Sequence, residues 1–196
     1  FGEKSKKRRP VIVYTDAMYD GAKTPAGMVG IVIYDPEDPE HKWRYASAGV
    51  TDDIIACFRK REQYVGQLEV LAAVAAYTSR PEQLRDRDVI HFIDNVGAYS
   101  GLGKGYSPDM DSARMISVFH TMNAALRSNV WFEYVPSKAN ISDLPSRNDF
   151  DLLNSPEYKA EVFELVWPPL SAWAGEYKAL FELYSGMRKK RSRKRA

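Results

Sequence analysis

Cysteine is almost absent from this chain, with Cys57 the only one among 196 residues. A single cysteine cannot form an internal disulfide, so we expect a protein of a reducing, intracellular environment. The three histidines, His41, His91 and His120, lack ligand spacing, which argues against a zinc centre. Long apolar runs are also missing, and the sequence therefore predicts no membrane-spanning segment and no membrane partner.

Basic residues are scarce between the two ends of the chain. Residues 10–187 contain 16 basic and 25 acidic residues, a formal net charge of −9, and the ends hold the other 12 basic residues. We therefore treat residues 1–9 as a basic N-terminal arm and residues 188–196 as a basic tail. Three interpretations stay open: contacts with nucleic-acid phosphates, solvated tails without a partner, or, for the tail, a nuclear-import signal.

The pattern along residues 10–150 predicts an α/β domain. Apolar, β-branched segments separated by short turns indicate three strands joined as an antiparallel meander. Helical and strand patterns then alternate, and the order β-β-β-α-β-α-β-α predicts a five-stranded mixed sheet, three antiparallel strands then parallel strands, flanked by helices. The expected elements are strands at 10–16, 28–34, 41–50, 88–94 and 130–135, and helices at 64–77, at about 109–127, and after the expected N-cap Asn140.

Residues 151–187 are predicted to form a helical C-terminal extension. Trp167-Pro168-Pro169 interrupts it, and an amphipathic helix with one apolar face follows. The face consists of five large side chains: Trp173, Tyr177, Leu180, Phe181 and Tyr184. We favour packing of this face on the core of the same domain, and docking on a neighbouring polymerase domain is the alternative.

Four acidic residues lie beside apolar sequence, where an unpaired charge is unfavourable. Asp16 and Asp94 end the first and fourth predicted strands, Glu69 lies on the first long helix, and Asp143 opens the last short helix. The first and fourth strands are expected to be neighbours, so Asp16 and Asp94 should emerge side by side. Each acid alone is more often a cap or turn residue, and the argument depends on the four together.

Several carboxylates in one place repel one another, and divalent cations relieve that repulsion. Oxygen ligands of this kind suit Mg²⁺ or Mn²⁺. Two such ions about 3.5–4 Å apart can hold a phosphodiester for in-line attack by water. The pattern therefore predicts a two-metal site in which the same residues are metal ligands and catalytic residues: Asp16, Glu69, Asp94 and Asp143.

The motifs around these acids resemble the RNase H domains of retroelement reverse transcriptases, of the LTR, gypsy-like or a related type. Three short motifs carry the resemblance: Tyr14-Thr15-Asp16-Ala17, Gln67-Leu68-Glu69-Val70-Leu71-Ala72 and Phe92-Ile93-Asp94-Asn95. The most specific piece is the closing segment 135–147, in which Asn140, Asp143 and the terminal Ser146-Arg147 match the pattern. The resemblance covers roughly residues 10–150.

This resemblance implies a five-stranded RNase H-like fold, two divalent ions, and endonucleolytic hydrolysis of the RNA strand of RNA/DNA hybrids. It also implies a parent polyprotein with a reverse-transcriptase polymerase domain, which agrees with Phe1 standing where a starting methionine would be. Two departures are visible in the closing segment. Ser137 and Lys138 occupy the loop where the family often has a histidine, and Ser142 stands where alanine is usual.

Five further residues are candidates for substrate binding. Gln67 and Asn95 flank predicted ligands and could hydrogen-bond a 2′-hydroxyl group. Lys104 lies in the glycine-rich run 101–105, which we expect to be a flexible connection, and it could contact a substrate phosphate. The full set is Gln67, Asn95, Lys104, Lys138 of the loop without histidine, and Asn140 of the closing motif.

Two alternatives to an active ribonuclease H remain. One is another nuclease of the same superfamily, of the resolvase or integrase type, against which the closing segment argues. The other is a catalytically weak or inactive RNase H-like module that binds nucleic acid or acts as a scaffold for a polymerase. The missing loop histidine and the acidic body favour the second alternative, and the four retained acids argue against it.

Overall fold

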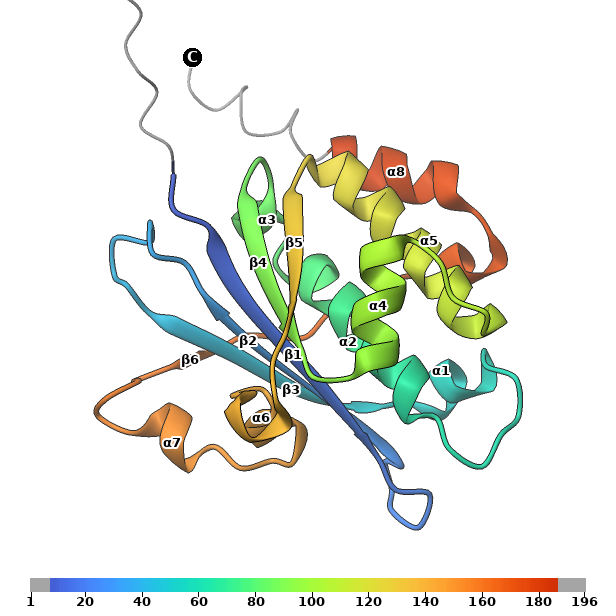
Figure 1. Ribbon diagram of the computed structural model, residues 1–196, viewed down its shortest axis with the longest axis horizontal. Helices are drawn as coiled ribbons and strands as arrows, with labels where there is room; N and C mark the ends of the chain where they lie inside the picture. The colour runs from blue at the N-terminus through green and yellow to red at the C-terminus, as the bar shows by residue number, and fades with distance from the viewer. Residues whose placement is uncertain (1–7, 187–196) are drawn as a thin grey trace, which may run out of the picture.

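The computed structural model describes residues 8–186, and its first three strands form an antiparallel meander (Figure 1). β1 (Val11–Tyr19) pairs with β2 (Gly27–Tyr34), and β2 pairs with β3 (Trp43–Val50). Alternate side chains of β1, such as Val11 and Val13, are fully buried in the main core. This alternation is the period-two pattern of a strand with one core-facing side, and the predicted meander is confirmed.

β4 (Asp88–Ile93) and β5 (Asn129–Tyr134) extend the sheet on the other side of β1. β4 runs parallel to β1, and β5 runs parallel to β4. A short strand, β6 (Glu161–Val162), pairs with β3, so the strand order is β5-β4-β1-β2-β3-β6. The predicted mixed α/β sheet is confirmed. The sixth strand is additional, because two residues are too few to show alternation in the sequence.

Helices cover both faces of the sheet (Figure 1). The long central helix α2 packs against β1 and β2, and residues 67–78 of it are all buried. On the opposite face, Leu153 of α7 packs with Val32 and Tyr45. The helices of the main core are α1 (Asp52–Ala56), α2 (Val65–Ser79), α3 (Pro81–Leu84), α4 (Val96–Lys104), α5 (Met110–Leu126) and α8 (Tyr177–Gly186), and those of the opposite face are α6 (Asp143–Ser146) and α7 (Asp151–Asn154).

Helix α4 contains most of the glycine-rich run at 101–105, and the prediction of a flexible connection there is wrong. A Cβ atom on Gly101 would lie only 3.0 Å from Ile116 Cδ1 of α5, so a small residue lets the two helices approach. The helix begins at Asn95, whose Oδ1 accepts a hydrogen bond from Ala98 N at 3.0 Å. It ends at Gly105, whose φ of 71° is left-handed.

The C-terminal extension folds back onto the same core. After β6, a 3-10 turn at Leu170–Ala174 leads into α8. Trp173, Leu180 and Tyr184 of the predicted apolar face are buried there, whereas Phe181 is 43% exposed. Packing of the extension on the domain's own core is therefore confirmed. No helix between residues 8 and 186 combines the length and apolar character needed to cross a membrane.

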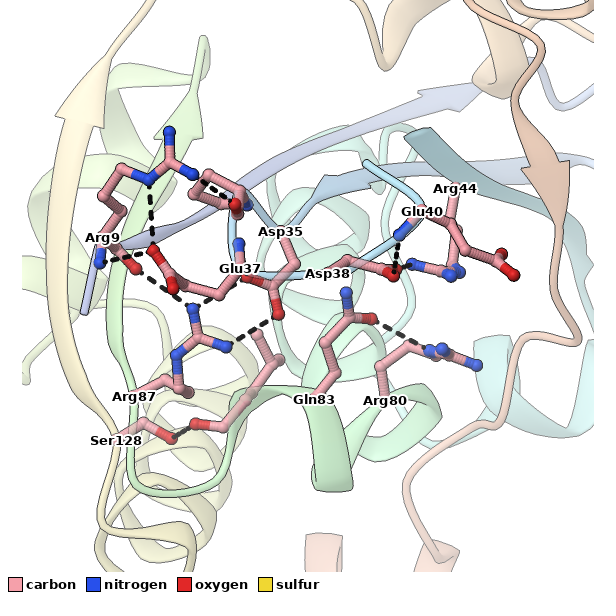
Figure 2. Close-up of polar contacts among 12 residues, drawn as sticks. Arg9, Asp35, Glu37, Asp38, Glu40, Arg44, Arg80, Gln83, Arg87 and Ser128 are labelled. Atoms are coloured by element: carbon pink, nitrogen blue, oxygen red, sulfur yellow. Dashed lines mark hydrogen bonds and ion pairs between the residues drawn. The ribbon is translucent and has the colours of Figure 1, made fainter. Parts of the chain in front are cut away.

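A buried ion pair joins the two halves of the sheet (Figure 2). Arg87, just before β4, donates to both carboxylate oxygens of Asp35, just after β2, at 2.7 and 2.8 Å, and to the Arg9 carbonyl oxygen at 3.1 Å. Burial alone would raise the pKa of Asp35, but hydrogen bonds from Arg87 and the Glu37 backbone bring that pKa below its usual value. Residues 1–7 of the predicted arm and the tail 188–196 lie outside the described residues.

Replacing Asp35 by asparagine should destabilise the protein by about 3–5 kcal/mol at pH 7, because the buried Arg87 charge loses its partner. The folded-state pKa of Asp35 lies below the unfolded value, so its contribution is present above the unfolded pKa and is lost as pH falls through the folded one. Urea unfolding from pH 7 to pH 3 should therefore show the difference between wild type and Asp35→Asn shrinking. As a control, Lys23→Gln breaks an exposed ion pair with Asp20 and should change stability by less than about 1 kcal/mol. Equal losses in both variants would contradict the argument.

Leu180→Ala should lower the free energy of unfolding by about 2–5 kcal/mol, because this α8 side chain is 2% exposed and its removal leaves a cavity against α5. Leu183→Ala on the same helix is the matched control, since Leu183 is 50% exposed, and it should change stability by less than about 0.5 kcal/mol. Denaturant unfolding measures both. A similar small effect for the two leucines would mean that α8 does not contribute to the core.

Candidate metal centre

Three carboxylates meet where β1, β4 and α2 come together. Asp16 of β1, Glu69 of α2 and Asp94 directly after β4 each offer an oxygen, and these oxygens all lie within 4.8 Å of one another. The pairing of β1 with β4 ends at Thr15 and Ile93, so the next residues, Asp16 and Asp94, lie side by side, as predicted. Beyond Thr15, β1 continues for four more residues, Asp16 to Tyr19, paired with β2 alone. Asp16 therefore lies within its strand and not at the end, which corrects the expectation from sequence.

Burial makes negative charge in this cluster unfavourable. Asp16 and Glu69 are only 5% and 4% exposed. Burial raises the pKa of Asp16 to about 6; a hydrogen bond from Ser146 opposes this rise, and the Asp94 and Asp143 carboxylates add to it. Burial likewise raises the pKa of Glu69 well above its usual value, and repulsion from Asp16 and Asp94 adds to that effect. In the absence of a cation, protons partly neutralise the cluster near neutral pH.

The donor set fits a hard divalent cation. Glu69 Oε1 accepts a hydrogen bond from Ala17 N at 3.3 Å, but its buried Oε2 has no hydrogen-bond partner within residues 8–186. A buried carboxylate oxygen without a partner is unfavourable, and a cation among the three carboxylates would satisfy it. Carboxylate oxygens are ligands that Mg²⁺ and Mn²⁺ prefer. The arrangement is thus consistent with divalent-metal binding, and the number of ions stays a prediction.

Asp143, the fourth predicted ligand, lies beside this cluster but does not belong to it. It opens α6 and is near enough to raise the pKa of Asp16. Its Oδ1 accepts a hydrogen bond from Arg147 Nε at 2.6 Å, an ion pair one helical turn apart on the surface. The structure therefore brings three of the four predicted carboxylates together and pairs the fourth with an arginine.

Asn140 ties the closing segment to the strand that carries Asp16. It is 3% exposed, and its Nδ2 donates to the Thr15 carbonyl oxygen at 3.1 Å. Its Oδ1 accepts hydrogen bonds from the backbone N and the hydroxyl of Ser142, at 3.3 and 2.6 Å. Ser142, not Asn140, is the N-cap of α6, so the predicted cap was wrong. The predicted substrate contact of Asn140 is untested, and its amide is engaged within the protein.

The other predicted substrate-binding residues lie around the cluster at different places. Gln67 is buried, and its Nε2 donates to Asp109 Oδ1, the N-cap of α5, at 3.1 Å. Asn95 and the exposed Lys104 line one groove of about 400 Å³ between α2, α4 and α5. Lys138 lines a separate pocket of about 310 Å³ that also includes Asp143.

Two residues without an assigned role in the sequence analysis shape the site. Ser146 is fully buried in α6, and its hydroxyl donates to Asp16 Oδ2. Gly30 lies opposite Asp16 in β2 and lets α6 approach the sheet. Ser146 was visible only as part of the closing motif. A glycine inside a strand is a signal for close backbone approach, and Gly30 could have been found that way.

Comparison with solved structures finds several similar chains, and two of them are described below. RNase H1 from the halophilic archaeon Halobacterium salinarum NRC-1 is 20% identical, with a TM-score of 0.47, over 68% of this chain and 91% of that chain. The prototype foamy virus protease-reverse transcriptase is 14% identical, with a TM-score of 0.41, over 75% of this chain and 22% of that chain. No protein-family model and no curated protein match the chain. Neither likeness decides the chemistry of this chain, for which the carboxylates are the evidence.

Glu69→Gln should stabilise the metal-free protein, because it replaces a buried carboxyl group that is either repelled as a charge or has to take up a proton on folding, and it keeps an acceptor for Ala17 N. A gain of about 1 kcal/mol corresponds to a rise in Tm of roughly 2–4 °C. Thermal unfolding with a chelator and with millimolar Mn²⁺ tests this, and Mn²⁺ should raise the Tm of the wild type more than that of the variant. The exposed Glu62→Gln is the control and should behave like wild type. If the metal-free Tm of Glu69→Gln were lower than that of the wild type, the Glu69 carboxylate would not be destabilised by its acidic neighbours.

Proposed function

We propose that this chain is a divalent-metal-dependent endonuclease of the RNase H type that hydrolyses the RNA strand of RNA/DNA hybrids. The observation that carries the proposal is the meeting of Asp16, Glu69 and Asp94 within 4.8 Å, two of them buried and one half-buried. Phosphodiester hydrolysis at such a site needs no side-chain nucleophile, because water activated by the metal would attack the phosphorus. The carboxylates would serve to hold the metal. Hybrid specificity is supported by the resemblance of the sequence motifs.

Asp16, Glu69 and Asp94 would hold the cation, and Asp143 is the ligand available for a second one. Bound in this way, Mg²⁺ or Mn²⁺ activates water and stabilises the charge that develops on the phosphate. The chain's own part is to hold the carboxylates in place, as Ala17 N does for Glu69 through its hydrogen bond. Asp94 is half-buried, so the cluster is partly accessible, and a phosphodiester could approach at this residue.

Contacts with the substrate would come from basic side chains, which the carboxylate cluster itself lacks. Lys104 and Lys138 are exposed and lie in two separate hollows, one beside Asn95 and the other beside Asp143. Each can contact a phosphate without sequence preference. The basic residues at both ends of the chain would add attraction to the nucleic acid that depends on salt concentration.

The proposal extends to a reverse-transcriptase polymerase domain in the parent protein and to an intracellular location, with import into the nucleus through the basic tail. The closing motif, with its similarity to retroelement polyproteins, supports the first. The single cysteine and the basic run at 188–195 support the second.

A second candidate function is a nucleic-acid-binding scaffold without cleavage. One observation favours it specifically: Arg147 holds Asp143 in an ion pair, so the fourth carboxylate is not free in the metal-free protein. The loop before Asp143 also lacks a histidine, as the sequence showed. Cleavage assays separate the two functions.

Incubation with a labelled RNA/DNA hybrid in Mg²⁺ or Mn²⁺ should cut the RNA strand, and Asp94→Asn should reduce the rate at least about 100-fold, since even residues that only orient metal ligands matter by up to that factor. Asp88→Asn, at the other end of β4, is the matched control and should retain activity. Duplex DNA should stay intact. If the wild type binds the hybrid but leaves it uncut in both metals, the scaffold function is the correct one.

A further inference from the structure

Helix α6 sits on one row of residues that crosses the three antiparallel strands. Asp16 pairs with Gly30, and Gly30 pairs with Ser47. The Ser47 hydroxyl donates to the Pro145 carbonyl oxygen at 2.6 Å, which attaches α6 at the β3 end of the row. Ser146 attaches it at the Asp16 end. Both ends of this row are thus connected to a single turn of the closing segment.

Gly30 explains how α6 comes close enough for these contacts. A Cβ atom at this position would lie 2.4 Å from the Ser142 carbonyl oxygen and 2.4 Å from Ser146 N, both of them backbone atoms. No real Cβ contact is that short, so any other residue would push the helix away from the sheet. The absence of a side chain at Gly30 therefore allows Ser146 to lie close to β2, within hydrogen-bond distance of Asp16.

The Ser146 hydroxyl is completely buried and has two acceptors within reach. One is Asp16 Oδ2, and the other is the Asp143 carbonyl oxygen at 3.0 Å. Its single proton forms the stronger hydrogen bond with the charged carboxylate. A carboxylate held at one oxygen by a fixed hydroxyl keeps its other oxygen available, and its rotation about the Cβ–Cγ bond is restricted.

We propose that Ser146 is a positioning residue of the candidate metal centre, which fixes the orientation of the Asp16 carboxylate toward the cation. This inference rests on the proposed metal-dependent function. Residues that orient metal ligands through hydrogen bonds typically change metal affinity 10–100-fold when removed. Ser146 acts through Asp16 and does not itself need to touch substrate or metal.

Ser142 provides a matched control for this role. It is as fully buried as Ser146 and lies one turn earlier, but its hydroxyl donates to the Asn140 amide oxygen and not to a carboxylate. Ser146→Ala and Ser142→Ala each remove one buried hydroxyl from α6, at the last residue of the helix and at its N-cap respectively. A purely structural effect on α6 should therefore appear in both variants, whereas an effect on Asp16 should appear in Ser146→Ala alone.

The decisive experiment is calorimetric titration of Mn²⁺ into wild type, Ser146→Ala and Ser142→Ala at pH 7. Ser146→Ala should weaken Mn²⁺ binding by about 10–100-fold, while Ser142→Ala should bind within about threefold of wild type, although both lower the Tm. Ser146→Cys, which keeps the shape with a weaker donor, should bind with intermediate affinity, and it replaces Ser146→Ala if that variant does not fold.

Equal weakening in the two alanine variants, or no weakening in either, would overturn the positioning role while leaving the metal centre intact. Absence of Mn²⁺ binding by the wild type would overturn the proposed metal centre itself and the role of Ser146 with it. A metal-free double-mutant cycle of Ser146→Ala with Asp16→Asn, read by unfolding, adds a readout that is independent of metal: the two substitutions should be non-additive.

Discussion

The parallel pairing of β1 with β4 is the constraint on which the candidate site depends. It stops at Thr15 and Ile93, so two carboxylates leave adjacent strands at the same level beneath α2. Just below them, Thr15 Oγ1 and His91 Nε2 form a buried hydrogen bond of 2.9 Å across the same two strands. Burial lowers the pKa of His91 to about 3, so its ring is neutral and offers the acids no positive charge. The positive charge that offsets the carboxylates must therefore come from outside this part of the core.

The sheet contains two kinds of buried acidic group, one paired with an arginine and one with a carboxylate oxygen that has no partner among residues 8–186. Where β2 ends and β4 begins, Arg87 satisfies both oxygens of Asp35, and the pair joins the two halves of the sheet. At the carboxylate cluster, Glu69 Oε2 is left without a partner inside the described chain, next to two other acids. Removal of a partner from a buried charge is strongly destabilising, as is leaving one unpaired. The Arg87–Asp35 pair is satisfied within the protein, whereas the carboxylate cluster lowers the stability of the metal-free fold. Such an unfavourable cluster of acids is typical of a ligand-binding site.

Much of this could be predicted from the sequence, because strands that run into a carboxylate leave a local signal. The β-branched run before Asp16 and the run before Asp94 identified both strands, and the order of elements placed them side by side. Local patterns could not show α4, because its glycines look like turn residues until Ile116 is seen against Gly101. Nor could they show that β1 continues past Asp16, since the end of the β1–β4 pairing is a property of two segments about 80 residues apart.

The closing segment shows where the sequence pattern stops being sufficient. Its motif marked Asn140, Asp143 and Ser146 as one unit, yet each does something different: Asn140 anchors the loop to β1, Ser146 holds Asp16, and Asp143 pairs with Arg147. These contacts bridge up to 130 residues, beyond the reach of local periodicity. An exposed pair of the Asp143–Arg147 kind contributes less than about 1 kcal/mol, whereas Asp16 and Glu69 are fixed by burial. The four acids that look equivalent in the sequence are thus two buried carboxylates, a half-buried third, and a fourth held only weakly at the rim.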